Sequence, residues 1–334
     1  MKKIKTVQIG WGHDHALAVW ECLKRNADVF ETAGYYIPET EKDKFPDRAA
    51  AFGGLKRYGS EEEIFRDPTV EAVVVETEEA ALTRYALAAV RAGRHVHMDK
   101  PGGFKAEEFD ALVSAVKERK TAFSLGYMYR YNPFVREAIE RVRRGELGEI
   151  FSVEAQMNCF HPPEKRQWLS AFTGGMMFYL GCHLIDLILQ IQGAPEEVIP
   201  FNASTGADGV TAEDFGFALL KYPNGVSFAK TCAEERGGFA RRRLTITGTK
   251  GTIEIDPLEM FEGGGQYAGM RENFSADWGD KGVFRKSAVF DRYDAMMRAF
   301  AETARGEREN PYSPDYEKLL FHTVLRACGA EENK

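Results

Sequence analysis

The first third of the chain alternates short β-branched runs with alanine-rich amphipathic segments. Lys5–Ile9, Ala72–Val75 and His95–Met98 have the composition of strands, and a segment with helical periodicity follows each of them. A parallel sheet produces this alternation, because each parallel crossover needs a helix and the helices then cover both faces of the strands. We therefore predict an α/β domain with a doubly wound parallel sheet over residues 1–122.

Further along the chain the pattern changes to longer alternating segments with glycine turns, such as Glu149–Asn158 and Phe215–Tyr222. Asn224-Gly225 follows the second segment, and both residues accept the positive φ of a type I′ hairpin. Gly175–Gln192 is mostly apolar and has the length of a buried helix. These features predict an α+β domain with an antiparallel sheet over residues 123–334.

Composition narrows the class of partner. The chain has 44 Lys and Arg residues against 51 Asp and Glu, so its net charge of −7 favours neither nucleic acid nor an anionic membrane. A small-molecule ligand is expected instead. No window approaches the ~18 apolar residues of a membrane span and no signal-peptide core is present, so we expect a cytoplasmic protein. The five cysteines form no C-x-x-C pair, which argues against a disulfide framework or structural zinc.

A glycine turn follows the first predicted strand and opens a helix. In this position the glycines let the backbone approach a pyrophosphate, and the helix N-terminus offers unpaired N–H groups. The third small residue of the usual G-x-G-x-x-G fingerprint is replaced by His15, and the position expected to hold a ribose-binding carboxylate is Ile37. The choice between NAD and NADP therefore stays open. The candidate cofactor-binding residues of the turn are Gly10, Trp11, Gly12, His13, Asp14 and His15.

The run His13-Asp14-His15 also contains ligand types that transition metals use. Three consecutive side chains at a helix start point in different directions, and no fourth ligand is apparent in the sequence. We therefore expect no metal here. The simpler interpretation is that Asp14 caps the helix and that the histidines lie near a phosphate or solvent.

Lys100 lies just beyond the end of a predicted parallel strand, at the edge where open α/β sheets bind ligands. Pro101 restricts Lys100 to extended conformations, which would help to direct the ammonium into a cleft. A surface turn lysine is the alternative, and position alone does not decide between the two.

A polar stripe interrupts the long apolar helix. Its residues are separated by 4, 3 and 4 positions, which at about 100° per residue places them within a wedge of about 60°. Such a stripe either faces a polar cleft or forms a closed structural network, and we favour the cleft. A histidine beside a tyrosine and an aspartate has the parts of a general base. The stripe consists of Tyr179, His183, Asp186 and Gln190.

Several motifs in this order resemble the glucose-fructose oxidoreductase, inositol dehydrogenase and MocA family over nearly the whole chain. Each motif is modest alone, but their order is specific. They are Gly10-Trp11-Gly12, Gly93 to Pro101 with Asp99-Lys100-Pro101, Arg130-Tyr131-Asn132-Pro133, Gly174-Gly175, Leu180 to Asp186, and Gly248 to Ile255.

The resemblance implies a Rossmann domain followed by a domain with a large open antiparallel sheet, which usually pairs with further copies as a homodimer or homotetramer. It also implies an NAD- or NADP-dependent oxidoreductase acting on CH-OH groups of sugars, cyclitols or related polyols. Lys100 matches the active-site lysine of the family and His183 its histidine, so both are assigned acid/base roles. Tyr179 stands where the family usually has an aspartate, which puts the strength of the base in doubt.

The remaining site predictions come from the layout of the family. On the cofactor side they add Ile37, Glu76, Thr77, Asp99, Lys100 and Pro101. On the substrate side they are Tyr127, Arg130, Asn132, His161, Arg166, Trp168 and Asp186. Departures from the family at His15, Ile37, Glu78 and Tyr179 leave open a non-catalytic metabolite-binding or regulatory protein as an alternative. The resemblance itself leaves open a second alternative, a coenzyme-assisted glycosidase or lyase, because some relatives use bound coenzyme in this way.

Overall fold

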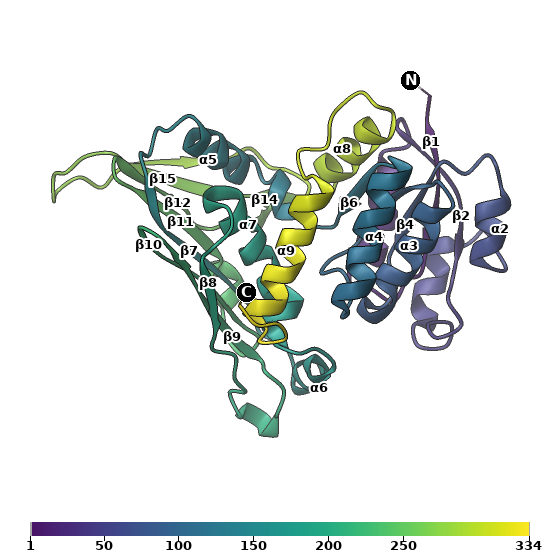
Figure 1. Ribbon diagram of the computed structural model, residues 1–334, viewed down its shortest axis with the longest axis horizontal. Helices are drawn as coiled ribbons and strands as arrows, with labels where there is room; N and C mark the ends of the chain where they lie inside the picture. The colour runs from purple at the N-terminus through teal and green to yellow at the C-terminus, as the bar shows by residue number, and fades with distance from the viewer. Residues whose placement is uncertain (1, 334) are drawn as a thin grey trace. The chain divides into compact units, whose positions relative to one another are not determined.

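In the computed structural model, which describes residues 2–333, six parallel strands form the first sheet in the order β3-β2-β1-β4-β5-β6 (Figure 1). The central strand β1 (Ile4–Ile9) pairs with β2 (Phe30–Tyr36) on one side and β4 (Ala72–Val75) on the other. The strand order therefore reverses at β1, and ligands of open α/β sheets bind beyond the carboxyl ends of the strands at such a point. The predicted doubly wound Rossmann sheet is confirmed.

The strands of this sheet are buried because helices pack on them. All four residues of β4 are buried, and the apolar side of each neighbouring helix faces the sheet. Helix α3 packs on α4, and α1 packs on α8. The remaining elements of the first unit are α1 (Ala16–Arg25), η1 (Pro46–Phe52), β3 (Lys56–Arg57), α2 (Glu61–Arg66), η2 (Glu79–Ala81), α3 (Leu82–Arg91), β5 (His95–Met98), α4 (Ala106–Arg119), β6 (Phe123–Leu125) and α8 (Asp294–Ala304).

The chain divides into two compact units whose boundary differs from the predicted one after residue 122. The first unit runs to Tyr127 and also includes Tyr293–Phe321. Strand β6 pairs with β5 and so belongs to the first sheet. In the returning segment, Asp294 accepts hydrogen bonds from Asn26 Nδ2 at 3.0 Å and Cys22 Sγ at 3.1 Å. Local sequence patterns do not reveal such a return, because its contacts are made 268 and 272 residues away.

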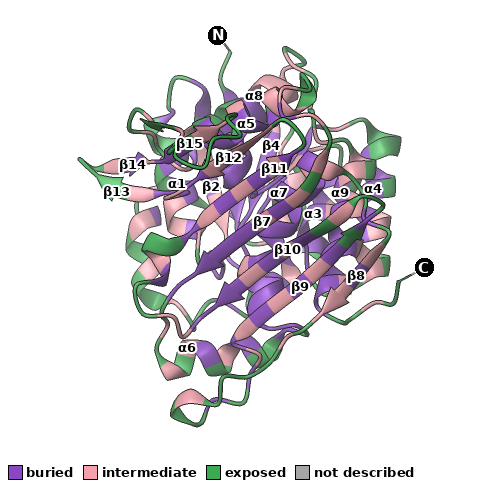
Figure 2. Cartoon of the chain, turned by 90° about the vertical axis from the view of Figure 1, so that its left-hand side faces the viewer, coloured by how far each residue is buried: buried purple, intermediate pink, exposed green. Residues whose placement is uncertain are grey.

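The second unit, Met128–Arg292 with the residues from His322 onward, contains an eight-stranded sheet in the order β16-β15-β12-β11-β7-β10-β9-β8 (Figure 2). The predicted antiparallel sheet is in fact mixed, because β7 (Ile150–Asn158) and β10 (Gly225–Cys232) run parallel. The strands β9 and β10 form a hairpin, and β10 pairs with β7. In the sequence, β7 and β10 are separated by several helices as well as by β8 and β9. The other pairs are antiparallel.

The other elements of this unit surround the sheet or extend it. They are η3 (Met128–Tyr131), α5 (Pro133–Arg143), α6 (Pro163–Trp168), η4 (Leu169–Ala171), η5 (Met177–Gly181), α7 (Cys182–Gln192), β8 (Glu197–Pro200), η6 (Ala207–Gly209), β9 (Phe215–Tyr222), η7 (Gly238–Arg241), β11 (Arg243–Gly248), β12 (Gly251–Ile255), β13 (Met260–Glu262), β14 (Gly265–Tyr267), β15 (Gly269–Asn273) and β16 (Val283–Lys286). Helix α9 (Pro314–Ala327) begins in the first unit and ends in the second. Between residues 2 and 333, no helix combines the length and the apolar character needed to cross a membrane.

The hairpin between β9 and β10 is not the predicted type I′ turn at Asn224-Gly225. Tyr222 pairs with Gly225, so the two turn residues are Pro223 and Asn224. Proline holds φ near −65°, which excludes the positive φ of a type I′ turn. Gly225 is required for another reason, since a Cβ there would lie 1.9 Å from the carbonyl oxygen of Phe151.

The predicted helix over Gly175–Gln192 consists of two parts. A π-helical turn over Met177–Gly181 precedes the α-helix α7. Because a π-turn holds more residues than an α-helical turn, Tyr179 is rotated relative to the regular spacing on which the polar stripe was based.

Candidate functional site

The glycine turn after β1 holds an anion supplied by the chain itself. Gly10 has φ +84°, and a Cβ there would lie 2.5 Å from Thr77. The backbone N–H groups of Trp11 and Gly12 donate to Glu41 Oε2 at 2.9 and 2.8 Å. The N–H of Glu78 donates to the other oxygen, Oε1, at 2.7 Å. A 1% exposed carboxylate therefore lies where the turn presents its N–H donors.

These donors fit a phosphate of a dinucleotide. Unpaired N–H groups at the carboxyl end of a parallel strand are the groups with which such turns bind phosphate oxygens. A phosphate would use the donors that now bind Glu41, so the side chain of Glu41 would have to leave first. Burial raises the pKa of Glu41, and although the backbone N–H groups lower it, the net pKa lies above the ordinary value.

The surroundings of the turn follow the sequence predictions only in part. Ile37 is 3% exposed and lies in the core, with no polar group to offer a ribose. Thr77 packs against Gly10 and donates through Oγ1 to the carbonyl of Glu78 at 3.2 Å. Helix α1 begins at Ala16 with His15, rather than Asp14, at the N-cap position, so the predicted capping by Asp14 is wrong.

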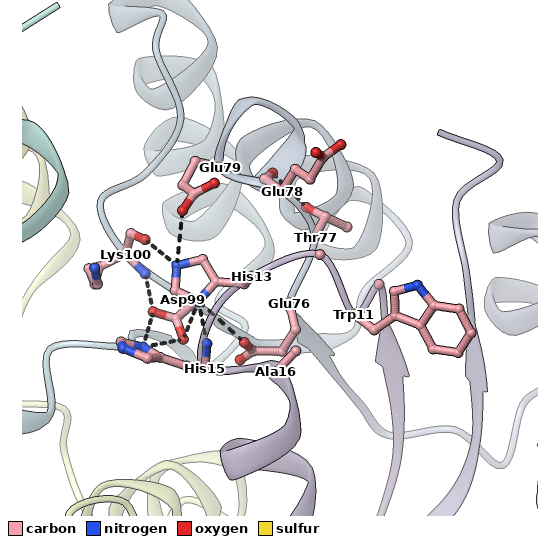
Figure 3. Close-up of polar contacts among 12 residues, drawn as sticks. Trp11, His13, His15, Ala16, Glu76, Thr77, Glu78, Glu79, Asp99 and Lys100 are labelled. Carbon is pink, nitrogen blue, oxygen red and sulfur yellow. Dashed lines mark hydrogen bonds and ion pairs between the residues drawn. The ribbon is translucent and has the colours of Figure 1, made fainter. Parts of the chain in front are cut away.

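His13 and His15 both turn toward Asp99, which follows β5 (Figure 3). The Nδ1 atom of His13 lies 3.3 Å from Asp99 Oδ2, and the Nδ1 atom of His15 lies 3.1 Å from the same oxygen. The expectation that these side chains diverge is therefore wrong, because the turn between β1 and α1 brings both rings to one side.

Two further carboxylates complete this cluster. Glu76 follows β4, is fully buried, and lies with Oε2 3.8 Å from His13 Nδ1. Neither of its carboxylate oxygens has a hydrogen-bond partner among the described residues. Glu79 Oε1 lies 3.8 Å from His13 Nε2. The cluster of His13, His15, Glu76, Glu79 and Asp99 thus collects at the carboxyl ends of β1, β4 and β5.

The charges in the cluster act on one another. Burial raises the pKa of Asp99, but the two imidazoles outweigh it and hold that pKa well below the ordinary value. Burial and the charge of Asp99 together raise the pKa of Glu76 well above its ordinary value. Burial lowers the pKa of His13, yet Asp99 and Glu79 raise it above 6.5 overall. For His15 burial dominates and lowers the pKa to about 4.

Lys100 joins the cluster through its main chain. Its backbone N–H donates to Asp99 Oδ1 at 2.7 Å, and its carbonyl oxygen lies 3.1 Å from His13 Nε2. The residue is 2% exposed, so the alternative of a surface turn lysine is wrong. Asp99, Lys100 and the histidines of the turn therefore lie together, and their cofactor-binding role stays a prediction.

In the second unit, the buried carboxylates lie against guanidinium groups. Asp186 accepts from Arg130 Nε and Nη2 at 2.8 to 3.1 Å, and Gln190 Nε2 donates to Asp186 at 2.9 Å. Arg166 is fully buried and contacts Asp208, with Asp214 and Glu234 each at 3.0 Å. A substrate role for Arg130, Arg166 and Asp186 stays a prediction, and these contacts also give each of them a structural role.

The predicted polar stripe divides between two environments. The ring of His183 packs edge-on against Tyr129 with centroids 5.0 Å apart, and His183 is 1% exposed. Tyr179 instead belongs to an aromatic group with Trp168 at 5.4 Å and His161 at 6.5 Å. The ammonium of Lys165 lies 3.6 Å from the centre of the Trp168 ring.

Two more predicted substrate residues have internal contacts. Asn132 Oδ1 accepts the N–H groups of Phe134 and Val135 and so caps α5, while its Nδ2 donates to Leu258 at 2.7 Å. Tyr127 is 1% exposed. Their substrate roles stay predictions.

Sequence reasoning missed Tyr129, whose hydroxyl donates to Glu259. Arg242 donates to the same carboxylate at 2.8 Å, and Arg292 lies 2.7 Å from it. Burial raises the pKa of Tyr129, so the hydroxyl stays protonated and donates. The only signal in the sequence was its place directly before the Arg130-Tyr131-Asn132 motif, which does not identify a partner 130 residues away.

A doubly wound parallel sheet whose glycine turn holds an anion defines a nucleotide-binding α/β protein. The chain matches "Oxidoreductase family, NAD-binding Rossmann fold" over residues 4–127 and "GFO/IDH/MocA C-terminal domain" over residues 135–254. It therefore belongs to the glucose-fructose oxidoreductase, inositol dehydrogenase and MocA family, an oxidoreductase family that binds NAD or NADP.

Named relatives are moderately similar to the chain. Trans-1,2-dihydrobenzene-1,2-diol dehydrogenase of Bos taurus is 28% identical over 60% of each chain. Scyllo-inositol 2-dehydrogenase (NADP(+)) of Bacillus subtilis is 30% identical over 48% of this chain and 45% of its own. The chain thus spans about 60% of the length of the first of these relatives. The aldose-aldose oxidoreductase of Caulobacter crescentus has the same fold, with a TM-score of 0.78, 20% identity, and coverage of 98% and 97% of the two chains.

Proposed function

We propose that the chain transfers a hydride between NAD or NADP and a CH-OH group of a sugar, cyclitol or related polyol. The observation that carries this proposal is the pair of N–H groups of Trp11 and Gly12, which already hold a carboxylate at the carboxyl end of β1. Two relatives named for a diol and an inositol support a hydroxylated substrate. When bound, the nicotinamide supplies the hydride acceptor or donor.

We assign Lys100 and His183 acid/base roles. Lys100 is buried, and its main chain is held by hydrogen bonds to Asp99 and His13. Its ammonium group would bind the substrate oxygen and polarise it. The buried His183 imidazole would take the hydroxyl proton during oxidation and return it during reduction. Tyr179 would donate a hydrogen bond to substrate. It cannot supply the negative charge of an aspartate near neutral pH.

The first test replaces Lys100 with Met, which keeps an unbranched side chain of nearly the same length and removes the ammonium. We expect turnover on a polyol panel to fall by at least about 100-fold, because positioned acid/base groups contribute that much or more. Coenzyme affinity, measured by Trp11 fluorescence, should change by only a few fold. The control is Lys105→Met, at an exposed lysine that pairs with Glu108 on the surface. Unchanged turnover in Lys100→Met would contradict the assignment.

One observation favours a second candidate function. Glu41 occupies the N–H donors that a coenzyme phosphate needs. This occupation is compatible with a regulatory or metabolite-binding protein that no longer uses coenzyme. Saturable binding of a polyol with no fluorescence response to either coenzyme at millimolar concentration would favour this candidate. Saturable coenzyme binding followed by turnover would exclude it.

We also propose that the exposed face of the eight-stranded sheet pairs with another copy of the chain, giving a homodimer or homotetramer. The half-buried Phe217 and Phe228 stack between β9 and β10 with centroids 5.5 Å apart, and Phe201, whose ring lies 6.2 Å from that of Phe217, is 52% exposed. Light scattering from the purified chain would measure the assembly directly.

A further inference from the structure

We propose that His13, His15, Asp99 and Glu76 form a binding site for one divalent first-row transition-metal ion. The site would lie at the carboxyl ends of β1, β4 and β5, inside the first unit. The four residues are also among those predicted to bind the coenzyme, but the test of the metal site uses neither coenzyme nor substrate, so it can fail separately from the proposed dehydrogenase function.

The tautomer of His13 is the first observation. Its Nε2 atom lies 3.1 Å from the carbonyl oxygen of Lys100, which can only accept, so Nε2 carries the proton. Its Nδ1 atom is therefore the ring atom that faces the cluster, 3.3 Å from the carboxylate oxygen Asp99 Oδ2. The backbone N–H of His15 approaches the same nitrogen at 3.2 Å, a long contact that a metal ion would displace. A cation bound between Nδ1 and Asp99 Oδ2 would take the place of the proton that these two atoms can share.

Glu76 supplies the second, independent observation. It is completely buried, and its two carboxylate oxygens accept no hydrogen bond from an N–H or O–H donor of residues 2–333. Its neighbour is a second acid, Asp99, with which it can share only a proton or a cation. Buried polar oxygens are almost always partnered, because leaving one unpaired costs about 1–3 kcal/mol. Figure 3 shows this carboxylate pointing at the imidazole of His13 and at Asp99, and Oε2 lies 3.8 Å from His13 Nδ1. A metal ion there would satisfy it.

The spacing of the ligand atoms agrees with this interpretation. Bonds of about 2.0–2.2 Å at tetrahedral angles put neighbouring ligand atoms about 3.3–3.6 Å apart. The distances from Asp99 Oδ2 to His15 Nδ1 and His13 Nδ1 are 3.1 and 3.3 Å, and that from His13 Nδ1 to Glu76 Oε2 is 3.8 Å. One ligand atom from each of His13, His15 and Asp99 lies within 4.8 Å of the others. Glu76 lies outside this compact group of three and would complete the site by a shift of its side chain toward Asp99 and His15.

The groups around these ligands are those that orient metal ligands in proteins. A metal-bound histidine usually donates its other ring N–H to a carbonyl or carboxylate, as His13 does to Lys100. Asp99 Oδ1 is held by the backbone N–H of Lys100 at 2.7 Å, which leaves Oδ2 directed at both imidazoles. The His15 side chain is 17% exposed, whereas that of His13 is fully buried, so an ion could enter past His15.

The ligand types decide the class of ion. Two imidazole nitrogens with carboxylate oxygens suit Zn²⁺, Fe²⁺ and Co²⁺, whereas Mg²⁺ and Ca²⁺ prefer an all-oxygen site. The sequence argument against a metal assumed that neighbouring side chains diverge and that no fourth ligand exists. The turn and Asp99 remove the first objection, because His13, His15 and Asp99 come together. Glu76, which follows β4 and lies 3.8 Å from His13 Nδ1, is the candidate fourth ligand that the sequence did not reveal.

The experiment titrates the full chain, freed of metal with a chelator that is then removed, with Zn²⁺ in competition with a chromophoric chelator. We expect one Zn²⁺ per chain with a dissociation constant of roughly micromolar or below. Bound Co²⁺ should show the visible absorption of a four-coordinate site, which reports the coordination of the metal without any activity assay. Retention of less than about half a Zn²⁺ per wild-type chain at about ten micromolar free metal would overturn the proposal, because a site with a micromolar dissociation constant is then roughly nine-tenths filled.

Three variants then test the ligand set. Asp99→Asn, His15→Gln and Glu76→Gln should each weaken Zn²⁺ binding, by about 100-fold or more for Asp99 and His15, because even loss of a group that only orients a ligand costs 10–100-fold. The matched control is His95→Gln, since His95 lies on β5 and its Nδ1 accepts the N–H of Ala122 outside the cluster. Circular dichroism checks the fold of each variant. Unchanged affinity in all three folded variants would place the bound zinc elsewhere and overturn the proposal.

Discussion

The buried acids of the two units are partnered in different ways. In the second unit Asp186 lies against Arg130, Asp214 against Arg166, and Glu259 against Arg242. In the first unit Asp99 and Glu76 face imidazoles, and Glu41 faces backbone N–H groups. A guanidinium is charged at every accessible pH and is part of the fold, whereas an imidazole or a set of N–H groups can exchange its partner.

This difference separates buried charges that stabilise the fold from buried charges that can bind a ligand. The guanidinium pairs close their networks, so removal of one member leaves a charge that nothing else can neutralise. The carboxylates of the first unit are arranged around groups that also accept external ligands, a cation at Glu76 and Asp99 and an anion at the donors now held by Glu41. The two units should therefore respond in opposite ways when a buried charge is removed.

The largest effect is expected in the second unit, from Arg130→Met. The substitution leaves the 1% exposed carboxylate of Asp186 without its guanidinium, so the free energy of unfolding should fall by about 3–5 kcal/mol. Urea denaturation measures it. Arg143→Met is the control, because Arg143 makes an exposed pair with Glu140 that is worth at most about 1 kcal/mol. Equal losses in the two variants would remove the distinction between closed and exchangeable networks.

In the first unit, removal of a buried charged side chain should instead stabilise the metal-free protein. Glu76→Met replaces a buried carboxylate that accepts no hydrogen bond with an apolar side chain of similar size. The metal-free protein should gain about 1–2 kcal/mol, because such replacements remove a desolvated acid. With saturating Zn²⁺, wild type should become more stable than Glu76→Met. A free Zn²⁺ concentration about 100 times the dissociation constant of wild type adds about 2.7 kcal/mol to its free energy of unfolding, and a variant that binds Zn²⁺ more weakly gains less. A Glu76→Met protein less stable than wild type without metal would argue against an uncompensated acid.

Much of the fold was predictable because its signals are local. Ala72–Val75, His95–Met98 and Phe215–Tyr222 are strands with the predicted bounds, since period and β-branching act over a few residues. The parallel pairing of β7 with β10, the π-turn over Met177–Gly181 and the return of Tyr293–Phe321 to the first unit were not predictable. Each depends on packing between segments far apart in sequence.

The candidate site divides in the same way. The glycine turn, Asp99 and Lys100 follow strands whose carboxyl ends meet at one edge, so their convergence could be predicted from topology. Glu41 lies in the loop after β2, about 30 residues from the N–H groups it accepts, and Glu79 begins a short 3-10 turn. Loop carboxylates have no periodicity, so only coordinates reveal what they contact.

The smallest expected effect concerns the partner of the glycine turn. Glu41→Gln keeps the shape of the side chain but replaces a charged acceptor with a neutral one, which should weaken its hold on the Trp11 and Gly12 N–H groups by about 1 kcal/mol. A coenzyme phosphate that competes for those donors should then bind about fivefold more tightly, as measured by Trp11 fluorescence. Glu39→Gln is the control, because that exposed carboxylate in the same loop pairs only with Lys42 among the contacts described. Unchanged coenzyme affinity in Glu41→Gln would mean that the phosphate does not use these donors, and the exchangeable character of the first unit would then rest on its cation-binding side alone.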